Sequence, residues 1–211
     1  MNSFNFFVPT QIRFGTGRRK ELKDILPFYG KKCLMVSRPL NGSLKETFEE
    51  IISIIRSANI EVSFFDEVIP NPTIDGVEKG VALAVENQVD FVIGIGGGSV
   101  LDTAKLIAFL YNENANINWE EAKSKYDDPF AISLKPEAAL PFIAVSTTSG
   151  TGSQCTQAAV VSDTKTKNKV TFFHSALFCR RETTAPTPPL PSSSSIYSYG
   201  ICSRSHANVP W

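Results

Sequence analysis

The feature that most constrains the fold is an apolar run that ends in glycines and leads into a helical pattern, in residues 91–105. Phe91–Ile95 is apolar without alternation, which predicts a strand buried on both faces of a sheet. Gly96–Gly98 follow, and helical spacing begins at Ser99. Such a turn directs free backbone N–H groups and the positive end of the helix dipole at one spot, which suits a phosphate. A tight turn that binds nothing is the alternative, and the pattern alone favours neither.

The rest of the chain up to residue 146 alternates between the same two patterns. Short apolar runs predict strands, and the stretches between them carry apolar residues at helical spacing. The strands are expected at 32–37, 60–65, 91–95 and 141–146, and the helices at 43–55, 74–85 and 99–111. Ser43 and Glu46 form a predicted capping box at the start of the first helix. This alternation is typical of an α/β domain with a parallel sheet.

Polar clusters follow three of the predicted strands: Ser37–Arg38, Gly96–Ser99 and Thr147–Ser153. Ligands of parallel sheets bind beyond the carboxyl ends of the strands, so we expect one shared site. The hydroxyls and amides of the third cluster suit a ribose or a pyrophosphate, and a flexible turn is the alternative. The glycine spacing matches neither a complete GxGxxG nor a Walker A loop. Lys105 is either a phosphate contact or a solvated helix residue.

The composition excludes several other classes of protein. The charges balance, with 21 basic and 21 acidic residues, so nothing indicates a nucleic-acid partner. The first residues lack the pattern of a signal peptide, and no apolar run approaches the ~20 residues of a membrane helix. The four cysteines, Cys33, Cys155, Cys179 and Cys202, are far apart and form no CxxC. We therefore expect a reduced, cytoplasmic protein without a membrane partner.

Four motifs, in this order, resemble the signatures of the iron-containing (group III) alcohol dehydrogenases. They are an opening segment that resembles the family's first hairpin (7–17), the PNPT turn (70–73), GGGSVLDTAK (96–105) and TTSGTGS (147–153). The resemblance extends from about residue 4 to residue 178. It implies a Rossmann-like parallel sheet with flanking helices that binds NAD or NADP. It also implies hydride transfer between the cofactor and a small alcohol or aldehyde.

The resemblance also implies roles for particular residues. Gly97–Ser99 would hold the pyrophosphate, and Thr147, Thr148 and Thr151 of the second loop (Thr147–Ser153) would line the adenine and ribose region. Asp102 would lie near the nicotinamide end, Asn71 at the rim, and Lys169, after a predicted hairpin over 159–170, would reach the cofactor. Pattern and resemblance together give these cofactor-binding candidates: Ser37, Arg38, Asn71, Gly96, Gly97, Gly98, Ser99, Asp102, Thr147, Thr148, Thr151 and Lys169.

Arg38 bears on the choice between the two cofactors. Many NAD-using members of the family carry an aspartate at about this place, which accepts a hydrogen bond from the ribose 2′-hydroxyl. An arginine cannot accept that bond but pairs with a 2′-phosphate. The sequence therefore favours NADP over NAD, with an ordinary surface arginine as the alternative.

The family's metal ligands have no counterparts in this sequence. Full-length members hold iron or zinc with an aspartate and three histidines from a C-terminal helical domain, whereas this chain has only His174 and His206. Neither has an aspartate four residues before it. No metal ligand and no catalytic residue is therefore assigned, and the helical metal domain is expected to be absent. The metal polarises the alcohol oxygen for hydride transfer, so the cofactor chemistry lacks a partner here.

The composition changes abruptly after Phe178. We expect residues 1–178 to form the NAD(P)-binding domain, of the dehydroquinate synthase-like type. Residues 179–211 are rich in proline and serine and are interpreted as a disordered tail or a frame-shift product. Three functions stay open: the cofactor-binding part of an alcohol dehydrogenase, inactive alone; a non-catalytic nucleotide-binding fragment; and a relative of glycerol dehydrogenase. A homodimer is a further possibility.

Overall fold

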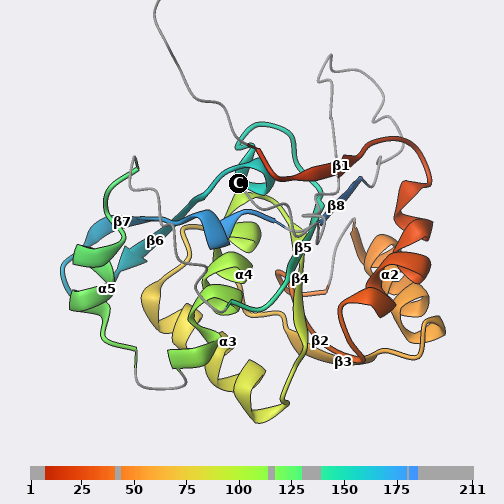
Figure 1. Cartoon of the computed structure of the whole chain (residues 1–211), viewed down its shortest axis with the longest axis horizontal. Coiled ribbons are helices and arrows are strands. Elements are labelled where there is room, and N and C mark those ends of the chain that lie inside the picture. The colour runs from red at the N-terminus through yellow and green to blue at the C-terminus, as the bar shows by residue number, and fades with distance from the viewer. Residues whose placement is uncertain (1–7, 41–43, 114–116, 130–138, 180, 185–211) are drawn as a thin grey trace, which may run out of the picture.

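A six-stranded parallel sheet forms the centre of the computed structural model, which describes residues 8–40, 44–113, 117–129, 139–179 and 181–184 (Figure 1). The strand order is β1–β8–β5–β4–β2–β3, and every neighbouring pair is parallel. The six strands are β1 (Gln11–Arg13), β2 (Lys32–Val36), β3 (Glu61–Phe65), β4 (Phe91–Gly96), β5 (Phe142–Ser146) and β8 (Arg181–Thr184). A separate antiparallel hairpin pairs β6 (Ala158–Asp163) with β7 (Asn168–Phe173).

Helices cover both faces of this sheet, so the molecule has three layers. The α-helices are α1 (Leu22–Ile25), α2 (Lys45–Ser57), α3 (Ile74–Glu86), α4 (Gly98–Leu110) and α5 (Trp119–Lys125). Short 3-10 turns lie at η1 (Arg18–Glu21), η2 (Leu26–Phe28), η4 (Tyr111–Glu113), η5 (Ser153–Cys155) and η6 (Ser175–Leu177). One core contains side chains of α3 and α4, and the other contains side chains of α1 and α2. Successive residues of β4 alternate between the two cores, which explains why the strand is apolar throughout.

Close approach between the elements depends on glycines. A Cβ on Gly80 of α3 would lie 2.2 Å from the Cδ1 atom of Ile107, so this glycine lets α3 pack directly on α4. A Cβ on Gly96 would lie 2.6 Å from a Cγ atom of Val100. The glycine at the end of β4 therefore brings the first turn of α4 down onto the strand.

The path of the chain reverses between β2 and β4. From β2 it moves outward to β3, and then it returns past β2 to form β4 on the other side. The carboxyl ends of β2 and β4 therefore flank a topological switch point, where α/β sheets open a crevice for ligands. The glycine turn and the Ser37–Arg38 segment follow these two strands.

The α/β fold class and the strands expected at residues 32–37, 60–65, 91–95 and 141–146 are confirmed, each with ends within one residue. The predicted hairpin over 159–170 is confirmed as β6 and β7. The opening hairpin expected over residues 7–17 begins outside the described residues; within 8–17 the structure has the strand β1, which pairs in parallel with β8. Ser43 of the predicted capping box lies outside the described residues.

The folded part continues beyond residue 178. Cys179 is buried in the core with α3 and α4, and β8 lies inside the sheet between β5 and β1. The folded part of the chain therefore does not end where the composition changes. Residues 185–211 lie outside the described part of the chain.

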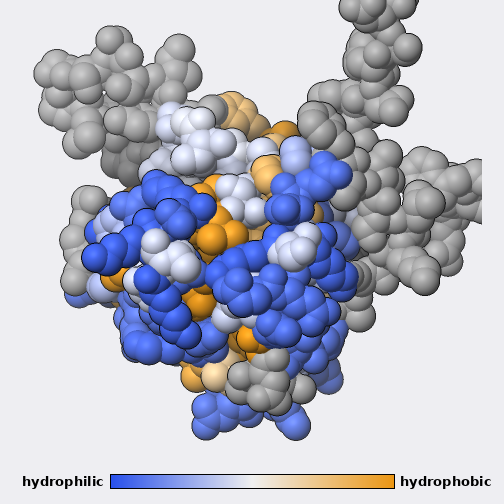
Figure 2. Space-filling view, turned by 90° about the vertical axis from the view of Figure 1, so that its left-hand side faces the viewer, coloured by the Kyte–Doolittle hydropathy of each residue, from blue (hydrophilic) through white to orange (hydrophobic). Residues whose placement is uncertain are grey.

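The face over α5 and the β6–β7 hairpin is mostly hydrophilic, with a band of hydrophobic residues between hydrophilic ones (Figure 2). Among the helices that the structure describes, none combines the length and the apolar character that crossing a membrane requires.

Candidate functional site

A pocket opens at the start of α4 and brings together segments that are far apart in the sequence. Its volume is about 180 Å³. Its walls come from the PNPT turn before α3, from the first turn of α4, from the second loop and from the β6–β7 hairpin. The lining residues are Asn71, Pro72, Gly98, Ser99, Asp102, Thr151, Val160, Val161, Ser162 and Lys169.

The first turn of α4 begins at a residue that cannot cap it with a side chain. The N-cap residue is Gly97, in extended conformation, and among the described residues it makes no side-chain cap hydrogen bond. By contrast, Thr73 caps α3, since the N–H of Gly76 donates to Thr73 Oγ1 at 3.2 Å. The N–H groups of a first helical turn have no partner within the helix, so those of α4 are available to an anion.

The glycine turn and the second loop pack directly on one another. The N–H of Thr147 donates to the carbonyl oxygen of Gly96 at 3.0 Å. A Cβ on Gly97 would lie 2.7 Å from the Thr148 hydroxyl oxygen, and a Cβ on Gly98 would lie 2.7 Å from a methyl carbon of Thr151. Only glycine at these two positions lets the threonines lie so close to the start of α4. The glycine turn and the second loop therefore lie together at the start of α4, as expected of two of the three polar clusters.

The PNPT turn and the β6–β7 hairpin form another part of the pocket wall. Asn71 adopts a left-handed conformation with φ of 55°. The turn is fixed to the hairpin because the N–H of Ser162 donates to the carbonyl oxygen of Pro72 at 2.7 Å. Lys169 Nζ donates to Asn71 Oδ1 at 3.1 Å, and both side chains are exposed. One lysine therefore lines the same pocket as the start of α4.

Asp102 lies in the second turn of α4, and both of its carboxylate oxygens accept hydrogen bonds. Ser153 Oγ donates to Oδ1 at 2.6 Å, and the N–H of Val160 donates to Oδ2 at 3.1 Å. Burial raises the pKa of Asp102 above its usual value, although the charge of Lys105 and these two hydrogen bonds act in the opposite direction. Asp102 lines the pocket and also connects its walls.

Both interpretations of Lys105 offered by the sequence are wrong. Its side chain is only 1% exposed, so it is not a solvated helix residue, and it does not line the pocket. Its ammonium group donates to the carbonyl oxygens of Thr156 and Ala158, at 3.1 and 2.8 Å. The lysine is satisfied by protein groups rather than by a phosphate.

Ser37 and Arg38 follow β2 at the same edge of the sheet but do not line the pocket. Arg38 is exposed. The Ser37 side chain is fully buried, and within the described part of the chain its hydroxyl has no hydrogen-bond partner. A direct ligand contact by that hydroxyl does not fit this burial. Gly96, Gly97, Thr147 and Thr148 stand next to the pocket through the two packed loops.

Comparison with known proteins places these features in a family. The family model for iron-containing alcohol dehydrogenase matches residues 9–181. The chain belongs to this family. The probable NADH-dependent butanol dehydrogenase 1 of Bacillus subtilis is 35% identical over 175 residues, which are 80% of this chain and 41% of that protein. An NADPH-dependent butanol dehydrogenase of Clostridium saccharobutylicum is 32% identical over 78% of this chain and 40% of its own length.

Solved structures of the family share the fold. The crystal structure of an NADH-dependent butanol dehydrogenase A from Thermotoga maritima matches with a TM-score of 0.73 and 31% identity, over 85% of this chain and 43% of that chain. The present chain thus spans about two fifths of the length of the iron-containing alcohol dehydrogenases that it matches.

The family's metal finds no ligand set in the part of the chain that the structure describes. No three histidine, cysteine, aspartate or glutamate side chains come together there as a metal site would require. The described residues therefore do not supply a site that would hold the iron.

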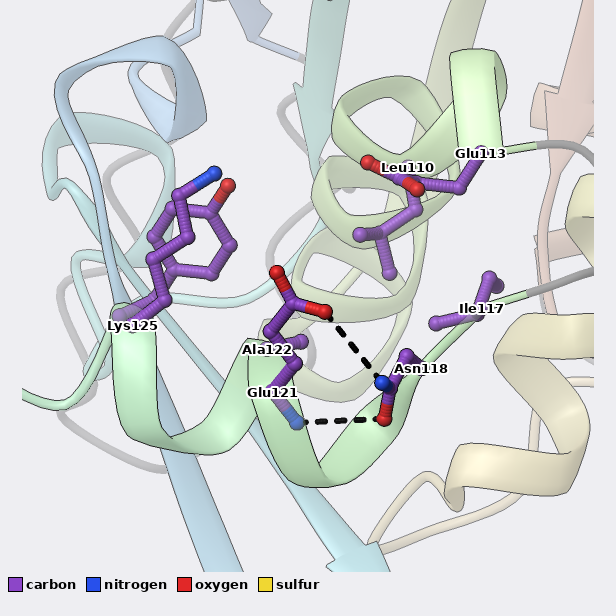
Figure 3. A pocket seen from close by; sticks show the side chains of 8 residues that line it. Leu110, Glu113, Ile117, Asn118, Glu121, Ala122 and Lys125 are labelled. Atoms are coloured by element: carbon purple, nitrogen blue, oxygen red, sulfur yellow. Dashed lines mark hydrogen bonds between the residues drawn. The ribbon is translucent and has the colours of Figure 1, made fainter.

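A second pocket, of about 50 Å³, lies beyond the other end of α4 (Figure 3). Leu110, Ile117 and Ala122 supply apolar walls, while Glu121 is already paired with Asn118, whose Nδ2 donates to its carboxylate at 3.3 Å. It is too small for a cofactor of this family and is separate from the switch point of the sheet.

The sequence did not single out Ser153, Thr156 and Val160, which contact Asp102 and Lys105 beside the pocket. Ser153 belongs to the hydroxyl-rich run, so the pattern held a signal for it. Val160 acts through its backbone N–H, which no side-chain pattern reveals.

Proposed function

We propose that this chain binds NADP or NAD at the start of α4 and forms the cofactor-binding part of a metal-dependent alcohol dehydrogenase. The observation that carries the proposal is a 13-residue helix whose N-cap is a glycine and whose first turn lines a pocket together with a lysine. Free N–H groups, the helix dipole and a nearby cation all favour a pyrophosphate.

Each wall has a chemically suitable role. Gly98 and Ser99 would bind the pyrophosphate through their backbone N–H groups, and Lys169 would neutralise part of its charge. Thr148 and Thr151 are exposed residues whose hydroxyls are suited to bind a ribose. When bound, the nicotinamide ring accepts or donates a hydride. Asp102 would keep its hydrogen bonds to Ser153 and Val160 and hold the nicotinamide end of the pocket in shape.

We expect binding without turnover. Polarising an alcohol oxygen requires the metal, and the described residues do not form a metal site. Added Fe²⁺ or Zn²⁺ with butanol and NADP should therefore give no reduced cofactor. Turnover under these conditions would show a complete enzyme instead. A non-catalytic nucleotide-binding role is the second candidate, and the same lack of a metal site favours it.

The test is a fluorescence titration of the whole chain with NADH and with NADPH. Dissociation constants within the roughly 1 µM to 1 mM range typical of enzyme KM values are expected. Lys169→Met should weaken both nucleotides roughly tenfold, because it removes one charged contact. Lys79→Met is the matched control, since Lys79 is an exposed lysine paired with Glu67 away from the pocket. No saturable binding of either nucleotide would refute the proposal.

The same titration compares the two cofactors through Arg38. If Arg38 pairs with a 2′-phosphate, Arg38→Ala should weaken NADPH roughly tenfold and leave NADH unchanged. An equal effect on both nucleotides would remove the preference for NADP. The matches to alcohol dehydrogenases favour this activity over that of a glycerol dehydrogenase. A cytoplasmic location and a homodimer remain predictions from the sequence.

A further inference from the structure

We propose that Lys105 and Asp102 are positioning residues that fix the second loop and the start of β6 against α4, and thereby set the affinity of the pocket for its nucleotide. This inference deepens the function proposed above and rests on it. Lys105 cannot act by contact with the ligand, because its side chain is buried and does not line the pocket.

The ammonium group of Lys105 is saturated by the segment that joins the second loop to β6. It donates to the carbonyl oxygen of Thr156 at 3.1 Å, to the Thr156 hydroxyl at 3.2 Å and to the carbonyl oxygen of Ala158 at 2.8 Å. An ammonium group has three protons to donate, and here three acceptors surround it. One helix residue therefore holds a segment that lies 51 to 53 positions later in the chain.

Asp102 holds the same segment at its two ends. Its carboxylate accepts from Ser153 Oγ before the Lys105 contacts and from the N–H of Val160 after them. Lys105 Nζ lies 3.9 Å from Asp102 Oδ1, so the two charges also stabilise each other. The pair thus restrains four successive points of the segment, from Ser153 to Val160, against α4.

This restraint is transmitted to the pocket wall. Thr151 lies two residues before Ser153, and its side chain packs on Gly98 in the first turn of α4. Val160 itself lines the pocket. If the segment moves away from α4, the distance between the hairpin wall and the helix start changes, and the nucleotide loses simultaneous contact with both.

Removing the lysine charge takes a charged donor away from half-buried acceptors. The carbonyl oxygens of Thr156 and Ala158 would lose the ammonium group, and Asp102 would lose its neighbouring cation. Polar groups that lose a partner recover hydrogen bonds by facing water, so the segment is expected to open toward water. Methionine is the appropriate replacement, because it fills a similar space without a charge or an N–H donor.

The pair also predicts a dependence on pH. As an anion, Asp102 accepts both hydrogen bonds most strongly and attracts Lys105, so the restraint is strongest at high pH and weakens as the pH falls through the pKa of Asp102. Burial already raises that pKa, and the charge of Lys105 lowers it. The other charged group of the same pocket is Lys169 of β7. In Lys105→Met the restraint should therefore be lost at a higher pH than in the wild type.

The experiment measures Lys105→Met by NADPH titration from about pH 5 to about pH 8 and by amide hydrogen exchange of the free chain. We expect a dissociation constant raised roughly tenfold, rising further toward acid pH than in the wild type. Exchange should accelerate roughly tenfold in peptides covering 147–160, whereas peptides of β2 and α2 should be unchanged. Lys79→Met should change none of these quantities.

Ser153→Ala is the second variant, because it removes one hydrogen bond to Asp102 and leaves the buried lysine in place. Its effects should run in the same direction, with binding weakened roughly threefold. Unchanged binding and exchange in both variants would overturn the inference, as would equal acceleration of exchange across the whole sheet. If the wild type binds neither nucleotide, the proposed function fails, and the local exchange difference alone then decides between positioning and a general loss of stability.

Discussion

The centre and the edge of the sheet are held in different ways. In β2, β4 and β5 every residue except Lys32 is buried, and the side chains fill two cores. In β1 at the edge no residue is fully buried, Ile12 is 52% exposed, and Phe14 just beyond it is 63% exposed. Its neighbour β8 reads Arg-Glu-Thr-Thr although it lies inside the sheet (Figure 1).

At the edge of the sheet, ion pairs rather than buried side chains connect the first segments of the chain to the rest of the fold. Glu21 pairs with both Arg13 of β1 and Arg18, and Arg19 pairs with Glu50 of α2. These contacts tie the first segments of the chain to the sheet and its helix layer through partly exposed ion pairs, which contribute little each. The pocket lies at the carboxyl end of the central strands. The part that positions the candidate site is therefore the part that side-chain packing specifies most strongly.

The largest expected effect comes from making one substitution in both regions. Ile93→Ala in β4 should lower the free energy of unfolding by about 4 kcal/mol, because Ile93 is fully buried and a cavity remains. Ile12→Ala in β1 should lower it by less than about 0.5 kcal/mol. Urea unfolding followed by circular dichroism measures both. Equal losses would abolish the distinction between centre and edge.

This difference also explains what the sequence could predict. Apolar runs identified the central strands because residues buried on both faces need no alternation, as Phe91–Gly96 illustrates. The strands β1 and β8 have three and four residues and mixed polarity. Their parallel pairing joins segments from opposite ends of the folded part, and no local pattern encodes such a contact.

In the candidate site, too, some residues could be predicted from local sequence patterns and others could not. One shared site was predicted for the glycine turn, the hydroxyl-rich loop and Ser37–Arg38, because each directly follows a central strand. The first two pack on one another, whereas Ser37–Arg38 does not line the pocket. The positions of Asn71 and Lys169 came from the family resemblance, since neither follows a recognisable local signal. Lys105 was misinterpreted because a lysine in a helix is normally solvated. Its burial depends on acceptors in a distant segment, which only the assembled fold brings to it.

A smaller expected loss of stability tests whether the centre of the sheet also depends on the close approach of α4 to the backbone of β4. Gly96→Ala should lower the free energy of unfolding by about 2 kcal/mol, because the new Cβ would meet Val100, whose branched side chain has little freedom to move. Gly76→Ala in α3 is the control. Its Cβ would have 3.4 Å to the nearest atom, and the helix should gain about 0.5 kcal/mol from alanine. A neutral Gly96→Ala would show that α4 does not need its present distance from β4.

The smallest effect concerns the ion pairs of the edge. Glu21→Gln removes the charge that Arg13 and Arg18 share, and we expect a loss of about 0.5 kcal/mol in urea unfolding at low salt. At about 1 M NaCl the screening length falls to about 3 Å, so the difference from the wild type should nearly vanish. The loss caused by Ile93→Ala should not change with salt, because it comes from packing. A salt-independent loss for Glu21→Gln would mean that this side chain also stabilises the edge by packing, and the contrast between the two regions would then be one of degree.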